Sequence, residues 1–327
     1  MTWSRRKLFV AALVLTSTGI AAPANAQGDA YPSKPIKLIV PFTAGGPGDV
    51  LARLLADKVG AELGQRILVD NRTGGNGIIG TDAVAKSEPD GYTILQMTGT
   101  QVVTPHLQSN IPYDLNRDLV PVVGVGAAPT VLVVPGKSGI RSLDDLAKLA
   151  KSSPNGINFG SGSVGSIAHL TAALLVQQLN IKATHVPYRG SSLAVQAIAA
   201  NEVQFFFPTP IEAAELAKSG DIRMIAVNAD QRLANFPDVP TMKELGMANV
   251  DARIWYGYYV PARTPPAIID RLYKAFAKVM SDPAVTERIQ TLGFVPKVTD
   301  AAEFGKFVNS ESARWKKVID ENQIKAD

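Results

Sequence analysis

Two glycine-rich loops carry most of the residues from which a binding chemistry can be argued. The first runs from Phe42 to Asp49 and reads FTAGGPGD, and the second runs from Gly160 to Ser166 and reads GSGSVGS. Each follows a short apolar segment and precedes a stretch whose apolar residues recur at helical spacing. The N–H groups at a helix N-terminus have no partner within the helix, and the helix dipole favours negative charge there. The loops therefore predict a site for a carboxylate or a phosphate.

Nucleotide binding is disfavoured by what surrounds the glycines. Gly75 to Gly80 and Gly160 to Gly165 both match G-x-G-x-x-G between a strand and a helix, which is typical of dinucleotide sites. The acidic residue that should hold the ribose about 20 residues later is missing, because the sequence near Thr100 and near His185 carries no Asp or Glu. No glycine loop ends in Gly-Lys-Ser/Thr, so a P-loop is excluded. The pattern favours a carboxylate ligand and predicts no cofactor.

Candidates for catalysis or metal binding are few. The sequence has no cysteine, and its three histidines are His106, His169 and His185. None lies beside a serine elbow, a paired carboxylate or a second ligand at metal spacing, so we predict no catalytic residue, no metal and no enzyme activity. His169, one turn into its helix, is interpreted either as a ligand contact or as a packed, hydrogen-bonded histidine. Asp49 either complements the helix dipole or fixes its loop and meets a ligand hydroxyl or ammonium group.

The elements around the two loops follow one another in the same order in both halves. Each half reads as a βαβαβ unit, which forms a parallel sheet with right-handed crossovers and places ligand-facing loops at the carboxyl ends of its strands. The predicted fold class is α/β, with two lobes that face each other across a cleft, each a mostly parallel sheet flanked by helices. The elements expected after the two loops are strands at 67–70, 92–97, 183–186 and 203–207 and helices at 78–87 and 193–200.

The chain also divides into regions. Arg5 to Lys7 precede a short apolar run, and Ala24 to Ala26 supply small residues for cleavage, so residues 1–26 are predicted to be a secretory signal peptide of the Sec or the twin-arginine type. Two apolar segments separated at Ala128-Pro129 mark the crossing to the second lobe, and RIWYGYYV at 253–260 marks the return. The expected regions are lobe 1 over 31–124, lobe 2 over 125–254, and the return strand and C-terminal helices of lobe 1 over 255–327.

Charge and hydropathy limit the partners. The formal net charge of +4 falls by three without residues 1–26, and no run of Lys or Arg remains to bind nucleic acid or a membrane surface. After the signal peptide no segment approaches the ~20 consecutive apolar residues of a membrane span. No nucleic-acid or membrane partner is therefore expected, and the chain is predicted to act as a monomer that binds a small molecule.

Several motifs together resemble one family. They are YPSKPI at 31–36, VPFTAGG at 40–46, NRTGGNG at 71–77, PDGYT at 89–93, VPYRG at 186–190 and WYG with PARTP within 255–265. On these motifs the chain resembles the substrate-binding proteins of tripartite tricarboxylate transporters, the Bug-type periplasmic receptors, over essentially all of its predicted mature length. The resemblance implies a periplasmic, two-lobed Venus flytrap that closes on a small organic acid and hands it to the transporter's membrane subunits.

The resemblance also implies where the ligand binds. The loops at 43–48 and 161–166 would hold its carboxylate, partly through ordered water, so valine at Gly46 or Gly162 is expected to obstruct the anion without unfolding its lobe. The predicted ligand-binding residues are Phe42, Thr43, Ala44, Gly45, Gly46, Asp49, Gly99, Gly160, Ser161, Gly162, Ser163, Val164, Gly165, Ser166, His169, Arg189, Gly190, Phe207, Pro208 and Thr209.

The second lobe departs from the family's usual pattern. Ser191 stands where the family often has proline, and Gln204 and Pro208 stand where it often has acids. The wall of that lobe is therefore expected to be less acidic and more aromatic, which favours a mono- or dicarboxylate, aromatic acids included, over an amino acid. For Trp255 and Tyr256, hinge packing and ligand stacking stay open. Two other functions also stay open: a receptor that presents the bound acid to a sensor kinase and, less favoured, an enzyme that uses a nucleotide.

Overall fold

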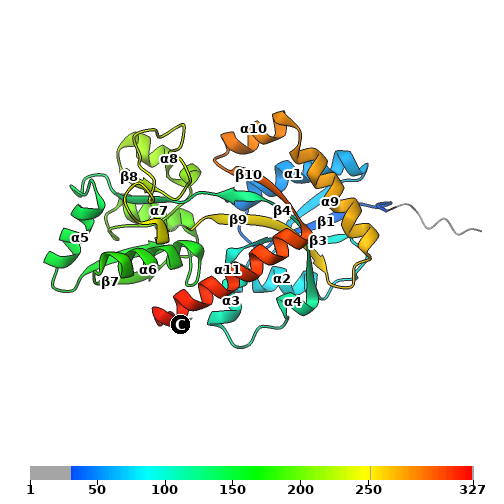
Figure 1. The fold of residues 1–327 in the computed structure, drawn as a ribbon, viewed down its shortest axis with the longest axis horizontal. Helices are drawn as coiled ribbons and strands as arrows, with labels where there is room; N and C mark the ends of the chain where they lie inside the picture. Colours follow the sequence, from blue (N-terminus) through cyan, green and yellow to red (C-terminus); the bar gives the residue numbers. More distant parts are fainter. Residues whose placement is uncertain (1–30, 251, 326–327) are drawn as a thin grey trace, which may run out of the picture. The chain divides into compact units, whose positions relative to one another are not determined.

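The computed structural model describes residues 31–250 and 252–325 (Figure 1). The predicted signal peptide lies outside the described residues. Residues from 31 onward form one compact unit, and its two largest hydrophobic cores are built within 131–250 and from both ends of the chain. Among the helices of the described ranges, none combines the length and the apolar character that a membrane crossing needs.

The first core surrounds a six-stranded sheet in the order β10-β4-β9-β3-β1-β2. Its first strand is apolar and almost wholly buried, which suits the centre of a sheet covered on both faces. β1 pairs in parallel with β2 and β3, whereas β9, β4 and β10 add antiparallel strands. The strands are β1 (Ile36–Val40), β2 (Ile67–Asn71), β3 (Thr93–Thr98), β4 (Leu119–Ala128), β9 (Ile254–Pro261) and β10 (Val295–Asp300).

Helices cover both faces of this sheet. α1 and α9 pack on one face, where the ring of Tyr258 stacks on Phe276 at 4.4 Å between centroids. α2, α3 and α11 pack on the other face, where Trp255 meets Phe304 edge to face. The helices of this part are α1 (Pro47–Leu63), α2 (Ile78–Ala85), α3 (Gly99–Leu107), α4 (Leu115–Asp118), α9 (Pro266–Met280), α10 (Pro283–Thr291) and α11 (Ala301–Glu321), with the 3-10 turn η1 (Gly75–Gly77) before α2.

The second core surrounds two strand pairs that a bridging segment joins. Phe206 pairs with Val133 of β5 and Phe205 pairs with Phe159 of β6, so 204–208 connects the pair β5-β8 to the pair β6-β7. The elements of this part are β5 (Val131–Pro135), β6 (Ile157–Ser161), β7 (Ala183–Pro187), β8 (Ile222–Val227), α5 (Leu143–Ser152), α6 (Ile167–Leu179), α7 (Ser191–Ala199), α8 (Pro210–Ser219) and the 3-10 turn η2 (Ala248–Val250).

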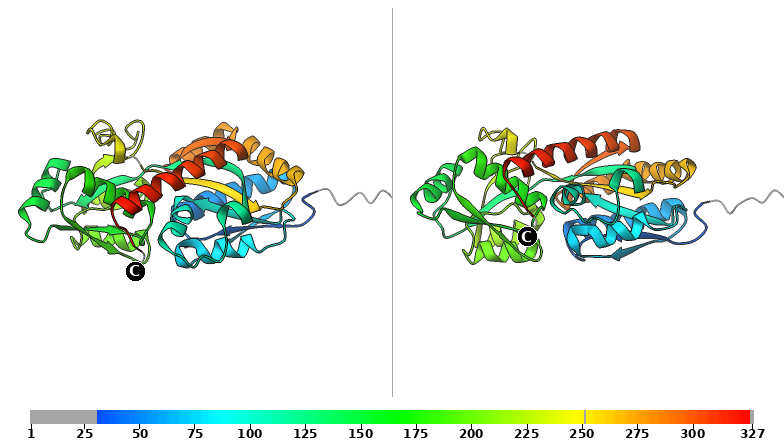
Figure 2. Two further views of the ribbon diagram at one scale, coloured as in Figure 1. Left: turned by 60° about the horizontal axis from the view of Figure 1, so that its bottom comes forward. Right: turned by 90° about the horizontal axis from the view of Figure 1, so that it is seen from below.

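Three segments connect the two cores. β4 and β9 run side by side from the first sheet, and their last pair is Ala128 with Ile254. The far end of α11 places Trp315 in one apolar cluster with Val103 of α3 and Ile167 of α6, and Figure 2 shows this helix passing from the six-stranded sheet toward α6. The C-terminal helix therefore packs on both parts.

The α/β class with two lobes is confirmed, with differences in detail. The first sheet is mixed rather than mostly parallel, because the return strand β9 enters between β3 and β4 and runs against both. The predicted strand at 203–207 is reduced to two bridges. β10 and α8 were not predicted. The proposed boundary between 124 and 125 falls inside β4, which the first sheet holds as far as Ala128.

Candidate functional site

The first loop leads from β1 into a helix whose N-terminus is open. Gly46 is the N-cap of α1, its backbone is extended, and no side chain caps the helix. Pro47 follows at the first helical position, where its missing N–H costs nothing. Thr43, Ala44 and Gly45 are exposed. The helix end expected to meet an anion is therefore accessible.

Asp49 fixes this loop from beneath. Its carboxylate, 3 % exposed, accepts hydrogen bonds from Gly45 N, Arg53 Nε and Asn71 Nδ2, each at 2.9 Å. Asn71 also donates to the carbonyl of Phe42 at 3.1 Å. Burial works to raise the pKa of Asp49, but the hydrogen bonds from Arg53, Gly45 and Asn71 outweigh it and hold the pKa below its ordinary value. Of the two roles considered for Asp49, the structure shows the fixing of the loop.

Replacing Asp49 with Asn should loosen the first loop. The amide keeps one acceptor and brings a donor against groups that also donate, so we expect a loss of about 2 kcal/mol of unfolding free energy. The ion pair itself contributes little to this figure, because the Arg53 side chain is half exposed. Urea unfolding at pH 7.5 measures it, with Asp57→Asn on the same helix, where the carboxylate is exposed, as the control. Equal stabilities for the two variants would contradict the role given to Asp49.

Three carbonyl groups of the second loop are already hydrogen-bonded, and two of them anchor the loop to the body of its lobe. The carbonyl of Ser161 accepts from Tyr188 N at 2.8 Å, and that of Gly162 accepts from Gly190 N at 2.9 Å. The peptide bonds here are trans, so each N–H points opposite to the carbonyl of the same peptide unit. The N–H groups of Gly162 and Ser163 therefore point away from the segment that binds these carbonyls.

The third hydrogen-bonded carbonyl belongs to Ser163. It accepts from the hydroxyl groups of Ser161 at 2.8 Å and Ser166 at 2.9 Å. By the same geometry the N–H of Val164 points away from these two hydroxyls. The loop thus offers a run of backbone donors whose carbonyl groups are already used, an arrangement suited to an anion.

The open helix end of the second lobe belongs to α7. Its N-cap is Gly190, at φ +112°, and no side chain caps it, while Arg189 beside it is exposed. α6, which follows the second loop directly, is capped by Ser166, whose Oγ accepts from His169 N. Because Gly190 donates to Gly162, the open end of α7 lies against the second loop. The loop and α7, rather than the loop and α6, provide the unused donors.

The two lobes meet through residues next to these loops. Asn76, at φ +54° in η1, donates its Nδ2 hydrogen to the carbonyl of Val164 at 2.9 Å. A Cβ at Gly99 would lie 2.6 Å from Ile167 Cδ1, which shows how closely α3 approaches α6 at this point. The sequence interpretation missed Asn76. Its signal was the Gly-Asn-Gly turn, since glycine and asparagine are the residues that adopt positive φ readily.

Other predicted ligand residues have structural partners inside the second lobe. Phe207 is 1 % exposed and lies in the core. Pro208 accepts from Val131 N at 2.8 Å, and Thr209 donates its hydroxyl to Glu212 at 2.7 Å. His169 is 5 % exposed and accepts from Gly165 N through Nδ1 at 3.0 Å. A ligand contact by any of these residues stays a prediction.

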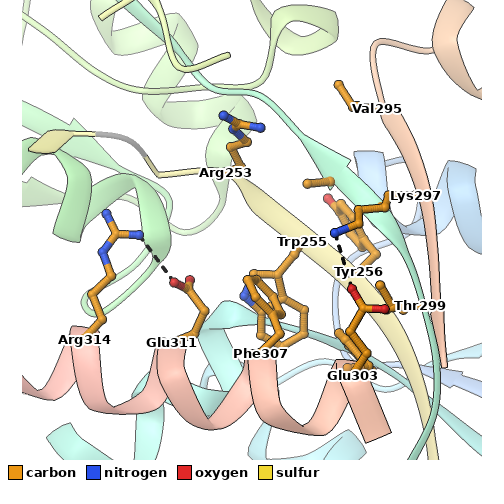
Figure 3. Close-up of a pocket in the computed structure, with 14 residues that line it drawn as sticks. Arg253, Trp255, Tyr256, Val295, Lys297, Thr299, Glu303, Phe307, Glu311 and Arg314 are labelled. Atoms are coloured by element: carbon orange, nitrogen blue, oxygen red, sulfur yellow. Dashed lines mark hydrogen bonds and ion pairs between the residues drawn. The ribbon is translucent and has the colours of Figure 1, made fainter. Parts of the chain in front are cut away.

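A cavity of about 410 Å³ lies on the strands that connect the lobes, and none of the predicted ligand residues lines it (Figure 3). Its aromatic wall includes Trp255, whose ring lies 5.7 Å from that of Phe307 and 5.5 Å from that of Phe304. Its charged side chains are paired: Lys297 with Glu303 at 3.5 Å, Arg314 with Glu311 at 3.3 Å and Arg253 with Asp230 at 2.6 Å. Trp255 packs on the two phenylalanine rings and also lines the cavity, so ligand stacking by Trp255 stays a prediction.

Comparisons with known proteins show the family and the fold. Residues 51–324 match the model of the tripartite tricarboxylate transporter family receptor. Protein BugT of Bordetella pertussis is 37 % identical over 322 residues, which cover 98 % of each chain. A Rhodopseudomonas palustris protein solved with adipate has a TM-score of 0.84 at 30 % identity, covering 90 % of this chain and 99 % of its own. MatC of the same organism, solved with bound malate, has a TM-score of 0.79 at 27 % identity, covering 88 % and 100 %. The chain belongs to the tripartite tricarboxylate transporter receptor family.

Proposed function

We propose that this protein captures a small mono- or dicarboxylate, aromatic acids included, between its two lobes and delivers it to the membrane subunits of a transporter. Export to the periplasm after cleavage behind Ala26 and action as a monomer are parts of the same proposal. The division into lobe regions 31–124, 125–254 and 255–327 is also part of the proposal. Since β4 belongs to the first sheet as far as Ala128, we place the passage of the chain from lobe 1 to lobe 2 near that residue.

The proposal rests on the backbone N–H donors that both lobes present. Two open helix N-termini, those of α1 and α7, and the anchored loop at 161–166 present backbone donors, and Asn76 ties the first lobe to the second loop. A hydrogen bond to a charged acceptor contributes about 1.5 to 3 kcal/mol, so a few donors from both lobes are needed to reach micromolar affinity. A carboxylate matches this set because it accepts several N–H groups at once.

The relatives point to the same ligand class. One similar structure was solved with adipate and another with malate, both dicarboxylates. The residues of the second lobe that differ from the family's usual acids, Gln204 and Pro208, add no negative charge that would repel such a ligand.

A thermal shift screen tests the ligand class. We expect at least one of adipate, malate and benzoate to raise the melting temperature, since a ligand at about 100 times its dissociation constant stabilises the native state by about 2.7 kcal/mol. The diamide of adipate is the matched control, because it keeps the chain length and removes the charge. An equal shift by the diamide, or a shift by a nucleotide and by none of the acids, would overturn the proposed function.

A further inference from the structure

Two histidines lie directly beneath the second loop. The rings of His169 on α6 and His185 on β7 stack with their centroids 3.6 Å apart and their planes 12° from parallel. The ring of Phe159 on β6 stacks on His185 with 5.1 Å between centroids and extends the stack into the core. Neither ring has the surroundings of a metal ligand, because no group of three or more metal-binding side chains occurs in the described part of the chain.

Each ring makes a hydrogen bond to the loop, and the chemistry fixes its direction. Gly165 N donates to His169 Nδ1 at 3.0 Å, so Nδ1 carries no proton. The hydroxyl of Ser161 donates to the carbonyl of Ser163, so its oxygen is left to accept from His185 Nε2 at 2.6 Å. The two rings thus hold Ser161 and Gly165 of the loop, and His169 does so as a neutral acceptor.

The neutrality of that acceptor matters for an anion site. His169 is the third residue after the N-cap Ser166, the position at which a capping box usually carries Glu or Gln. α3 has Gln101 at this position and α8 has Glu212, each within a capping box. The two helices that meet at the contact between the lobes, α3 and α6, therefore both carry a neutral acceptor there, whereas α8 carries a carboxylate.

We propose that His169, supported by the stacked His185, is a positioning residue that fixes the loop at 161–166 through Gly165 with a neutral acceptor, and so keeps its donors available to a carboxylate. The proposal rests on the proposed function for its ligand, but not for the geometry of the loop. Burial and the neighbouring His185 lower the pKa of His169 to about 3, which keeps Nδ1 unprotonated at neutral pH.

Three substitutions at His169 separate the parts of the proposal. His169→Gln keeps a neutral acceptor, His169→Leu removes the acceptor without adding a polar group to a buried site, and His169→Glu keeps the acceptor and adds a charge. His106→Leu is the matched control, because His106 on α3 also makes one hydrogen bond, to Ser312 at 2.8 Å, and this bond does not involve the second loop. Amide hydrogen exchange at Gly165 and calorimetric titration with adipate are measured for each variant at pH 7.5.

The expected results differ among the variants. In the Leu variant, exchange at Gly165 should accelerate at least about 10-fold and adipate affinity should fall at least about 10-fold, while the Gln variant stays within about 3-fold of wild type in both. The Glu variant should keep the protection of Gly165 and lose at least about 10-fold in affinity. His106→Leu should change neither quantity.

The failures can be told apart. Unchanged exchange at Gly165 in the Leu variant would overturn the positioning role, and equal affinities of the Gln and Glu variants would overturn the part played by neutrality. If the wild-type protein bound no carboxylate at all, the proposed function would fail, yet the exchange of Gly165 would still decide whether His169 holds the loop. A circular dichroism melt of the Leu variant tests whether it is folded. If the Leu variant is unfolded and the Gln variant has the exchange and affinity of wild type, the acceptor is required for folding as well.

Discussion

A valine at Gly46 is expected to lower the affinity for the best carboxylate of the screen at least about 100-fold, because its side chain would lie over the open N-terminus of α1 and block about two charged hydrogen bonds. The fold should tolerate it. Gly46 has φ −74°, which any residue adopts, and the nearest atom to an added Cβ is the carbonyl oxygen of Thr43 at 3.4 Å. We therefore expect the melting temperature of the ligand-free protein to stay within a few degrees.

Calorimetric titration with that acid, together with a thermal melt without it, measures both quantities. The control is Gly305→Val on α11, where an added Cβ also has its nearest neighbour at 3.4 Å, Pro121 Cγ, and where no predicted ligand residue lies. Normal affinity in the Gly46 variant would show that the first loop does not hold the anion.

The same substitution at Gly162 is not an equivalent test, which corrects the expectation from the sequence. A Cβ at Gly162 would lie 2.8 Å from Ser191 N and 3.1 Å from the carbonyl carbon of Gly190. These are backbone atoms that cannot move aside without displacing the start of α7. Valine there should therefore lower stability and affinity together.

Lowering the pH from about 6.5 toward 3 should destabilise the wild-type protein through His169 by up to about 1.4 kcal/mol per pH unit. Burial, with a smaller effect of His185, lowers the pKa of this histidine to about 3 in the folded protein, from an ordinary value of 6.5. The unfolded chain therefore takes up a proton in this range that the native protein does not. Above about pH 6.5 the neutral ring makes its full contribution to the free energy of unfolding, and this contribution is lost progressively as the pH falls below 6.5.

Urea unfolding of wild type and His169→Gln at pH 7.5, 5.5 and 4.5 measures this effect. Glutamine does not titrate, so the difference in unfolding free energy between the two proteins should change by about 1.4 kcal/mol per unit below pH 6.5, always in favour of the variant. Asp49 and other carboxylates contribute equally to both proteins and cancel in the difference. A difference that did not vary with pH would mean that the pKa of His169 in the folded protein is close to its ordinary value.

Local sequence was enough to locate the two loops and most of the elements around them. The apolar run of β1, the glycines before α1 and the spacing of apolar residues in α11 each depend on neighbours within a few residues, so they could be predicted from the chain alone. The cap of α5 is an equally local contact, because the hydroxyl of Ser142 accepts from Asp145 N three residues later. The family resemblance, which the comparisons confirm, rests on such short motifs as well.

Tertiary structure decided which groups the loops present. The bond from Asn76 to Val164 joins residues 88 positions apart, and the stack of His169 on His185 joins two elements of the second lobe. No local pattern gives the direction of a side chain that is fixed by so distant a partner, so the sequence left both roles of His169 open. The antiparallel entry of β9 between β3 and β4, and the open N-terminus of α7 in place of α6, likewise follow from contacts between distant segments. The sequence by itself determined where backbone donors could gather, and the packing of the two lobes determined which donors are already used and which remain for a ligand.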